Sequence, residues 1–243
     1  MNTAINRVVR MAEKACPDEV CGALVKRAEG HIDVVEMENT HQGHDKFTAE
    51  MPFHLARDYR HIVAFYHSHS GDPMLSQDDI DSCRAIGIPY LVVSAARGQV
   101  CSYAPKPAPL LGRPFFWGLY DCTTLIRDAW TMAAGDPPIV RHPSIREWKD
   151  GTFDMPAALA EYGLQPAKEP CPGDVLLFVR NDQRRTQHLE LLLEDGCVLS
   201  HVTGNISHRR PLTASDLEQA NGVFRCESKS ISTALSRTCT TVQ

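Results

Sequence analysis

Apolar residues in the first half of the chain follow helical spacing once and strand spacing several times. Between residues 3 and 15 they recur every three or four positions, which predicts an amphipathic helix that Pro17 ends. Short apolar runs then predict strands, the first entered after Glu19. The first strand ends at Val25, and the others are expected at 31–37, 62–66, 89–94 and 100–103. A short helix is expected at 52–61.

The second half begins with a helical pattern and continues as strands. Apolar residues from Cys122 to Trp130 share one helical face. A strand is predicted at 172–180, followed by a hairpin over 188–202 that turns at Asp195-Gly196. Residues 205–211 read as a polar turn with solvated arginines. A short helix at 216–221, a strand at 222–226 and a fraying, flexible tail at 228–243 complete the chain.

Proline is concentrated between the two halves. Residues 104–114 contain four prolines and a glycine, a composition typical of a semi-rigid linker. We therefore predict an N-terminal domain at 1–103, a linker at 104–112 and a C-terminal domain at 113–227. The alternative is a long proline-rich loop inside one domain.

Composition excludes several classes of protein. The net charge of −5 gives no basic surface for nucleic acid, and no apolar run reaches the ~20 residues of a membrane span. The N-terminus lacks the apolar core of a signal peptide. Nine scattered cysteines do not resemble a disulfide framework, so synthesis in a reducing compartment is expected.

The stretch from Phe65 to Asp79 carries the first candidate site. Side chains alternate along a strand, so His67 and His69 leave the same face. Ser76 and Asp79 have the spacing of a helix N-cap. Two imidazoles and a carboxylate converging there form a three-ligand zinc set with a fourth position open. The alternative is a solvated strand end followed by an ordinary helix cap.

This stretch resembles the JAMM (MPN-type) metallopeptidases, whose signature is His-x-His, a loop, then Ser-x-x-Asp. The resemblance implies that His67, His69 and Asp79 bind zinc and that Ser76 helps to stabilise an oxyanion. Glu19, between Pro17 and Gly22, matches the family's general base, although it would otherwise be read as a surface acid. The loop after His69 is one residue shorter than usual in that family and lacks its usual first proline.

Cys122 is the candidate nucleophile of the second half. It is expected in the first turn of its helix, where the unpaired N–H groups favour a thiolate. The alternative is an inert core cysteine. A nucleophilic cysteine needs a base from elsewhere in the chain, and His188 opens the predicted hairpin.

This half resembles the NlpC-type cell-wall peptidases, which have a papain-like fold. The matching elements are Asp121-Cys122 after Trp-Gly, the Pro-Gly-Asp before a strand, and His188. The resemblance implies Cys122 as nucleophile and His188 as base. The third catalytic group depends on the turn. A two-residue turn at 195–196 places His201 on the face of His188, whereas a three-residue turn places Ser200 there. We favour His201, because imidazole orients a catalytic histidine better.

Both halves together resemble the tail assembly protein K family of lambda-like phages. That resemblance implies a two-domain protein, α/β plus α+β: a JAMM-like sheet flanked by helices, then a papain-like NlpC fold. It also implies zinc, phage tail-tip proteins as partners, and a place in the host cytoplasm during assembly and in the virion tail. The expected activity is hydrolysis of peptide or isopeptide bonds, with peptidoglycan stem peptides as substrate.

Two other functions are open at this point. A structural assembly factor with one or both sites degenerate would fit the short loop after His69 and the serine at position 200. A deubiquitinase-like cellular enzyme fits the JAMM half alone, but the NlpC-like half argues against it.

Overall fold

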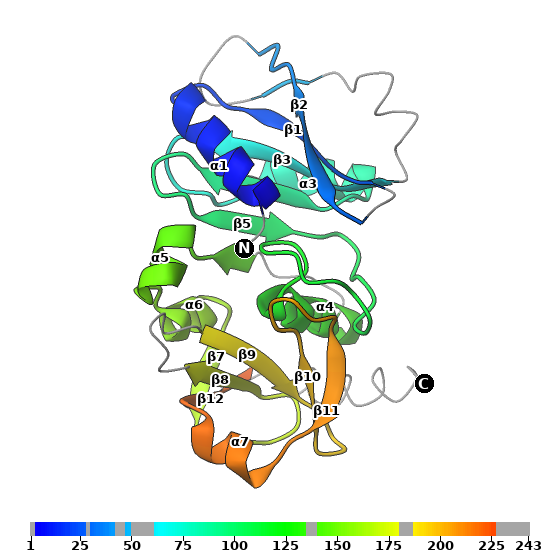
Figure 1. Cartoon of the computed structure of the whole chain (residues 1–243), viewed down its shortest axis with the longest axis vertical. Helices are drawn as coiled ribbons and strands as arrows, with labels where there is room; N and C mark the ends of the chain where they lie inside the picture. Colours follow the sequence, from blue (N-terminus) through cyan, green and yellow to red (C-terminus); the bar gives the residue numbers. More distant parts are fainter. Residues whose placement is uncertain are drawn as a thin grey trace. The chain divides into compact units, whose positions relative to one another are not determined.

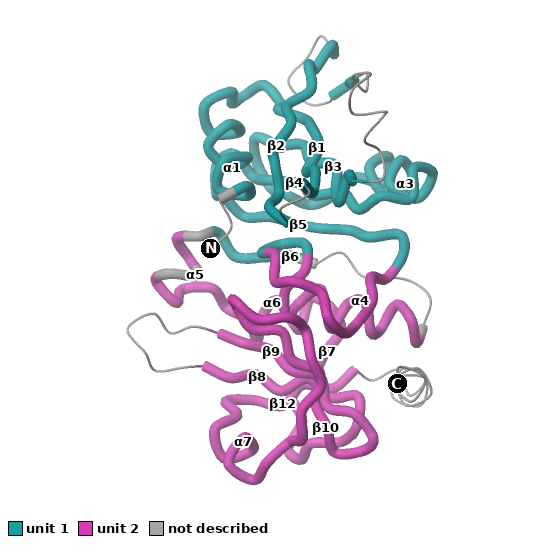
Figure 2. Tube along the Cα trace, turned by 45° about the vertical axis from the view of Figure 1, so that its right-hand side comes forward, with its two compact units in different colours: residues 1–106, 117–119, 139–145 teal, residues 107–116, 120–138, 146–243 magenta. Residues whose placement is uncertain are grey.

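A computed structural model describes residues 3–27, 30–41, 47–49, 61–134, 140–179 and 187–226. It divides into two compact units (Figure 2). Unit 1 comprises residues 1–106, 117–119 and 139–145, and unit 2 comprises 107–116, 120–138 and 146–243. The expected tail at 228–243 lies outside the described residues, as does the expected helix at 52–61 except for its last residue.

Unit 1 is built on a six-stranded mixed sheet in the order β2-β1-β3-β4-β5-β6. Its strands are β1 (Cys21–Lys26), β2 (Ile32–Met37), β3 (Ile62–His69), β4 (Tyr90–Ser94), β5 (Val100–Tyr103) and β6 (Val140–His142). Only β3 and β4 are parallel among these pairs. Helix α3 (Gln77–Ile86) connects them, so the end of β3 and the start of α3 lie at the same edge of the sheet.

Helices pack on unit 1 as the apolar pattern predicts (Figure 1). Helix α1 (Thr3–Ala15) has the expected bounds and buries Ile5, Val8 and Ala12. Cys83 of α3 belongs to a core cluster with Phe65 of β3, and Cys21 and Tyr90 come from neighbouring strands. The predicted strands and the helix after Ser76 are therefore confirmed.

Unit 2 is built on an antiparallel sheet in the order β11-β10-β9-β8-β12-β7. Its strands are β7 (Leu164–Ala167), β8 (Val175–Val179), β9 (Gln187–Leu192), β10 (Cys197–Ser200), β11 (His208–Pro211) and β12 (Gly222–Cys226). Its helices are α4 (Cys122–Ala134), α5 (Ile145–Asp150), α6 (Met155–Glu161) and α7 (Ala214–Gln219). Leu125 and Ala129 of α4 share a core cluster with Leu189 and Leu191 of β9.

The structure corrects the interpretation of residues 205–211. They were expected to form a polar turn with solvated arginines, but residues 208–211 are strand β11, which pairs with β10. Exposed fractions alternate along this edge strand, and Arg210 contacts two carboxylates. Backbone pairing and charge neutralisation thus outweigh the low hydrophobicity of the segment.

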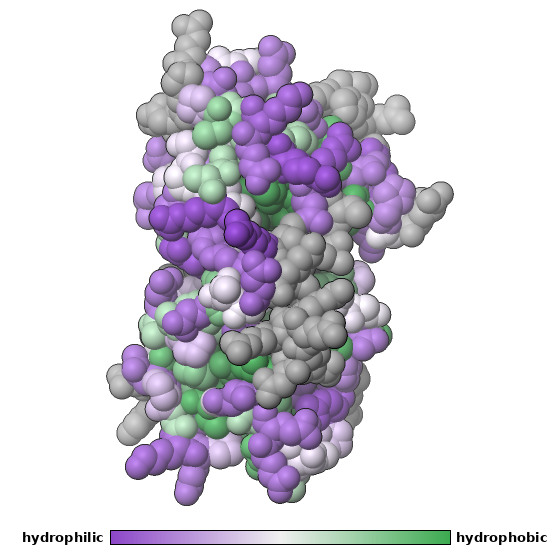
Figure 3. All heavy atoms as spheres, turned by 60° about the vertical axis from the view of Figure 1, so that its left-hand side comes forward, coloured by the Kyte–Doolittle hydropathy of each residue, from purple (hydrophilic) through white to green (hydrophobic). Residues whose placement is uncertain are grey.

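The surface of the described residues is mostly polar on the face drawn in Figure 3, with smaller apolar areas between the hydrophilic side chains. No helix in the described part of the chain is both long and apolar enough to span a membrane.

Gly22 provides a test of the packing in unit 1. A Cβ at this position would lie 2.2 Å from the backbone oxygen of Val35 and 2.5 Å from the hydroxyl of Tyr66. Gly22→Ala should therefore lower the free energy of unfolding by about 1–3 kcal/mol, because overpacking forces the backbone to shift. Denaturant unfolding measures this change. Gly71→Ala is the control, since nothing lies within 4 Å of its added Cβ. Equal stability of the two variants would contradict the described packing.

Candidate active sites

The end of β3 brings three potential metal ligands together in unit 1. The Nε2 atoms of His67 and His69 lie 3.2 Å apart, and His67 Nε2 lies 3.3 Å from Asp79 Oδ1. Ligand atoms of the three residues all fall within 4.8 Å of one another. The structure therefore places His67, His69 and Asp79 in one cluster.

The loop after His69 fixes how that histidine faces the cluster. His69 Nδ1 lies 3.2 Å from the backbone oxygen of Asp72, a partner that can only accept a hydrogen bond. Nδ1 must carry the proton in the neutral ring, which leaves the Nε2 lone pair facing His67. The six-residue loop from Ser70 to Leu75 thus still orients the second histidine.

Ser76 orients the carboxylate of Asp79. Asp79 Oδ2 accepts hydrogen bonds from the backbone N–H and the hydroxyl of Ser76, each at 2.7 Å. The Asp79 N–H donates back to Ser76 Oγ at 3.2 Å, which completes a capping box at the start of α3. Oδ1 remains directed at His67. In this arrangement the Ser76 proton is committed to Asp79 rather than offered to an oxyanion.

Glu19 lies beside the cluster because its neighbour is bonded to β3. Val20 and Ser68 exchange hydrogen bonds, from Val20 N–H to Ser68 Oγ and from Ser68 N–H to the Val20 oxygen, both at 3.0 Å. Glu19 Oε1 lies 4.0 Å from His69 Nε2, and the Glu19 side chain is 4% exposed. The buried Glu19 carboxylate therefore lies next to the cluster, at a distance from His69 longer than a hydrogen bond.

The electrostatics of His69 and Asp79 favour the forms that bind metal. Burial, and then the charge of His67, lower the pKa of His69, so its ring is neutral at neutral pH. Burial acts to raise the pKa of Asp79, but hydrogen bonds from His67 and Ser76 outweigh it and the pKa lies well below its usual range. Metal binding requires neutral imidazole and ionised carboxylate.

The donor set and two of its three separations fit zinc. Ligands about 2.0–2.1 Å from a tetrahedral metal lie about 3.3 Å from one another. The 3.2 Å and 3.3 Å separations around His67 Nε2 match that edge length. Two nitrogens and one oxygen are a common set for a zinc ion that keeps one position open.

Cys122 occupies the first residue of α4 in unit 2, as predicted. The preceding Asp121 anchors this turn. Asp121 N–H donates to Thr124 Oγ1 at 2.8 Å, and Thr124 N–H donates to Asp121 Oδ1 at 3.0 Å. This reciprocal pair explains why an aspartate precedes the cysteine, because it satisfies N–H groups left open at the helix start.

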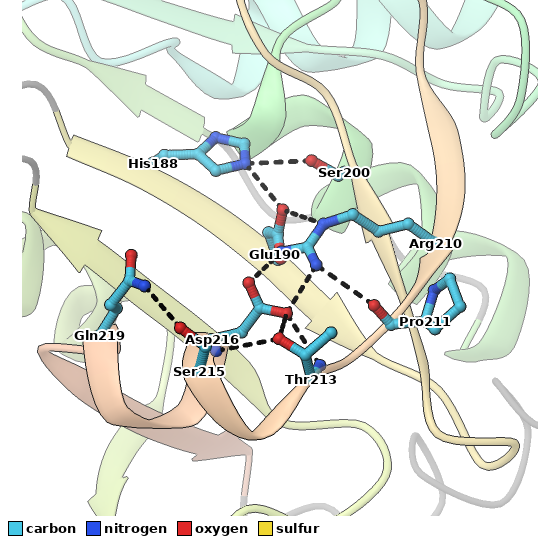
Figure 4. Close-up of polar contacts among 9 residues, drawn as sticks. All are labelled: His188, Glu190, Ser200, Arg210, Pro211, Thr213, Ser215, Asp216 and Gln219. Carbon is cyan, nitrogen blue, oxygen red and sulfur yellow. Dashed lines mark hydrogen bonds and ion pairs between the residues drawn. The ribbon is translucent and has the colours of Figure 1, made fainter.

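His188 interacts with side chains from three elements. Cys122 of α4 is among the groups that raise the pKa of His188, so the two residues expected to carry nucleophilic catalysis lie close together. His188 Nε2 lies 3.3 Å from Glu190 Oε1 and 3.2 Å from Ser200 Oγ (Figure 4). Since Nε2 lies within hydrogen-bond distance of Glu190 and Ser200, Nδ1 is the ring nitrogen available to the Cys122 thiol.

These contacts favour a protonated His188. Burial alone would lower its pKa, but hydrogen bonds to Cys122 and Glu190 and the charges of both outweigh burial and raise the pKa from 6.5 to about 9. The imidazolium is therefore present below about pH 9. An imidazolium beside a cysteine is the partner with which a nucleophilic thiolate can form an ion pair.

The β9–β10 hairpin decides which candidate third group reaches His188. Leu199 pairs with Leu191, and continuing this register aligns Ser200 with Glu190. That is the three-residue-turn alternative, with Gly196 at a φ of 73°. Ser200, and not the favoured His201, therefore contacts His188.

His201 lies in a different environment of unit 2. Its ring packs edge-on against Phe115 with centroids 5.2 Å apart, and the residue is fully buried. Burial, and then the charge of Arg113, lower its pKa to about 4, against the opposing effect of Asp121. His201 is thus a neutral core imidazole at neutral pH.

Sequence reasoning missed Glu190 and Arg210 as members of the site. Glu190 is 3% exposed and receives two hydrogen bonds from Arg210, Nη2 to Oε2 at 2.6 Å and Nε to Oε1 at 3.3 Å. One signal was present: Glu190 stands two residues after His188 among three leucines, so both point to the same face. Nothing local marked Arg210 as their neighbour.

Comparison with known proteins follows the same division of the chain. Residues 2–106 match the model of prokaryotic homologues of the JAB domain, and residues 112–222 match the NlpC/P60 family. The tail tip assembly protein K of Escherichia phage lambda is 31% identical over 167 residues, which cover 68% of this chain and 81% of that protein. Its counterpart in Escherichia phage N15 is 25% identical over 214 residues, 85% of this chain and 87% of that protein.

One solved structure is also similar in part. The solution structure of a protein from Desulfitobacterium hafniense has 23% identity and a TM-score of 0.33, covering 42% of this chain and 80% of that one.

The family matches confirm the expected two-domain fold class, with a JAB-type half and an NlpC/P60 half. The identity to the lambda protein and the share of it that is covered place the chain in one family: it belongs to the tail tip assembly protein K family.

Proposed function

We propose that the chain is a tail-tip assembly protein that also hydrolyses peptide bonds through Cys122 and His188. The proximity of these two side chains, one at a helix start and one on a strand, carries the proposal, because Cys122 is among the groups that raise the pKa of His188. The assembly role rests on relatives named as tail tip assembly proteins. Tail-tip proteins are then the partners, with assembly in the host cytoplasm and the virion tail as the places of action.

The chemistry begins with the thiolate. Cys122 Sγ attacks the carbonyl carbon of the scissile amide to form a tetrahedral oxyanion, while His188 holds the proton. Collapse breaks the C–N bond, and the His188 proton goes to the departing amine. His188 then takes a proton from water, whose oxygen attacks the thioester carbonyl; the C–S bond breaks and releases the carboxylic acid product, which restores the Cys122 thiolate and the protonated His188. The proposed substrate is a peptidoglycan stem peptide.

The N-terminal cluster would add a second hydrolytic site. His67, His69 and Asp79 would hold zinc, which supplies a Lewis acid and a water nucleophile at neutral pH when it is bound. Buried Glu19, 4.0 Å from His69, would accept the proton of that water as general base and pass it to the leaving amine. Ser76 would keep Asp79 in its ligating orientation.

A second function has support from the sequence and from the contacts of Ser76. In this alternative, the protein is a structural assembly factor in which one or both sites are degenerate. The shortened loop after His69, the serine at position 200 and the commitment of the Ser76 proton to Asp79 favour it.

Replacing the nucleophile tests the cysteine site. Cys122→Ala should abolish release of peptides from purified peptidoglycan, a loss of 10²-fold or more by the order of magnitude typical of nucleophile removal. Released amino groups measure the reaction. Cys171→Ser, at an exposed cysteine, is the matched control and should retain activity. Undiminished hydrolysis by Cys122→Ala would contradict the assignment.

Metal analysis tests the N-terminal cluster. The purified, unchelated protein should contain about one zinc ion per chain, because three potential ligands converge there. His67→Ala with His69→Ala should lose that zinc, measured by mass spectrometry of the dissolved protein. His31→Ala, at an exposed histidine, should keep it. Zinc near zero in the folded parent protein would remove the metal proposal.

Complementation separates the two functions. A phage that carries the double variant Cys122→Ala, His67→Ala should form fewer infectious particles if either hydrolytic site is used. Plaque titre and electron microscopy of tails measure the outcome, with Cys171→Ser as control. Normal titre and normal tails would favour the structural alternative.

A further inference from the structure

We propose that Glu190 is the residue that positions His188, a role that neither Ser200 nor His201 fills. This inference rests on the proposed function of the Cys122–His188 pair. Glu190 would not touch the substrate; it would act through His188 by fixing the ring tautomer and stabilising its charge.

The hydrogen-bonding capacity of the two neighbours separates them. Glu190 Oε1 and Ser200 Oγ both lie within 3.3 Å of His188 Nε2. An ionised carboxylate can only accept, so it requires a proton on Nε2 and leaves Nδ1 for the thiol. A hydroxyl can donate or accept, so Ser200 alone would permit either tautomer.

Glu190 is held ionised by a network that extends to α7 (Figure 4). Arg210 binds it through Nη2 and Nε, and the same guanidinium binds Asp216 at 2.8 Å and 3.1 Å. Asp216 in turn accepts from the hydroxyl and N–H of Thr213, which begins the capping box of α7. Burial acts to raise the pKa of Glu190, but His188, Ser200 and Arg210 lower it.

Charge balance explains why this network favours imidazolium. His188 is faced by Cys122 from α4 and by Glu190 from its own strand β9. Glu190 in turn contacts Arg210 from β11, which also binds Asp216 from α7. The other neighbours of His188 are uncharged: Ser200 from β10, and Phe178 from β8, whose ring centroid lies 6.4 Å from that of His188. Two carboxylates share one guanidinium. The remaining negative charge is neutralised when His188 is protonated.

His188 borders a cavity of about 720 Å³. Its lining includes Glu190, Ser200, Arg210 and Asn205. A small carboxylate such as formate can therefore reach the place of the Glu190 side chain if that side chain is removed.

The test compares Glu190→Gln, which keeps shape but removes charge, with Ser200→Ala. In Glu190→Gln the pKa of His188, followed by NMR of histidine-labelled protein, should fall by about 1–3 units, the range for loss of an adjacent opposite charge. Ser200→Ala should shift it by less than about 0.5 unit. With substrate, kcat of Glu190→Gln should drop on the order of 10²-fold with little change in KM, and the alkaline limb of its pH profile should move to lower pH.

Two further measurements keep the proposal falsifiable if Glu190→Gln folds poorly. In the parent protein above pH 9, nitrogen shifts should show neutral His188 with its proton on Nε2. In Glu190→Ala, formate should raise the pKa of His188 toward the parent value.

Contrary results would overturn the proposal: the proton of neutral His188 on Nδ1, an unchanged titration in Glu190→Gln, or an equal shift in Ser200→Ala. Titration and tautomer need no substrate. An inactive parent protein with the expected titrations would therefore contradict the proposed hydrolysis and still support the role of Glu190.

Discussion

Strand register is the constraint on which both candidate sites depend, because a shift by one residue turns a side chain to the opposite face of its sheet. In unit 1, β1 pairs with β3 so that Cys21 is opposite His67. Two hydrogen bonds between Val20 and Ser68 extend this pairing and bring Glu19 to the metal-ligand cluster. In unit 2, the β9–β10 register brings Ser200 to His188 and leaves His201 elsewhere.

Buried charge is the second feature shared by the sites. A buried carboxylate is costly unless it is paired, and each one described here has partners. Asp79 accepts from Ser76 and faces His67, whereas Glu190 is bound by Arg210 and contacts His188. The pairing of Glu190 helps to keep His188 charged, because Glu190 raises its pKa. Burial and His67 lower the pKa of His69 and keep its ring neutral at neutral pH.

The two sites differ in how local their construction is. His67, His69, Ser76 and Asp79 come from one strand–loop–helix segment, and only Glu19 arrives from a distant part of the chain. The second site draws on α4, β9, β10, β11 and α7, which are brought together by sheet formation over about ninety residues, from Cys122 to Asp216. Its geometry is therefore less visible in any short motif.

The sequence by itself determined the elements that carry most of the candidate residues and the local grouping of His67, His69 and Asp79. Period-two alternation put His67 and His69 on one face, the cap at Ser76 placed Asp79, and the helical face after Asp121 placed Cys122 at a helix start. These features depend on neighbours within a few residues, whose geometry the chain fixes locally.

Only the tertiary structure decided which residue is the third partner of His188 and which carboxylates Arg210 binds. Asp195-Gly196 suits two turn lengths, so one residue of register separated Ser200 from His201, and the pairing of the whole sheet made that choice. Arg210 read as solvated because its carboxylate partner, Glu190, is twenty residues away in sequence. Ion pairs across strands follow from how the strands are ordered, and no local pattern contains that order.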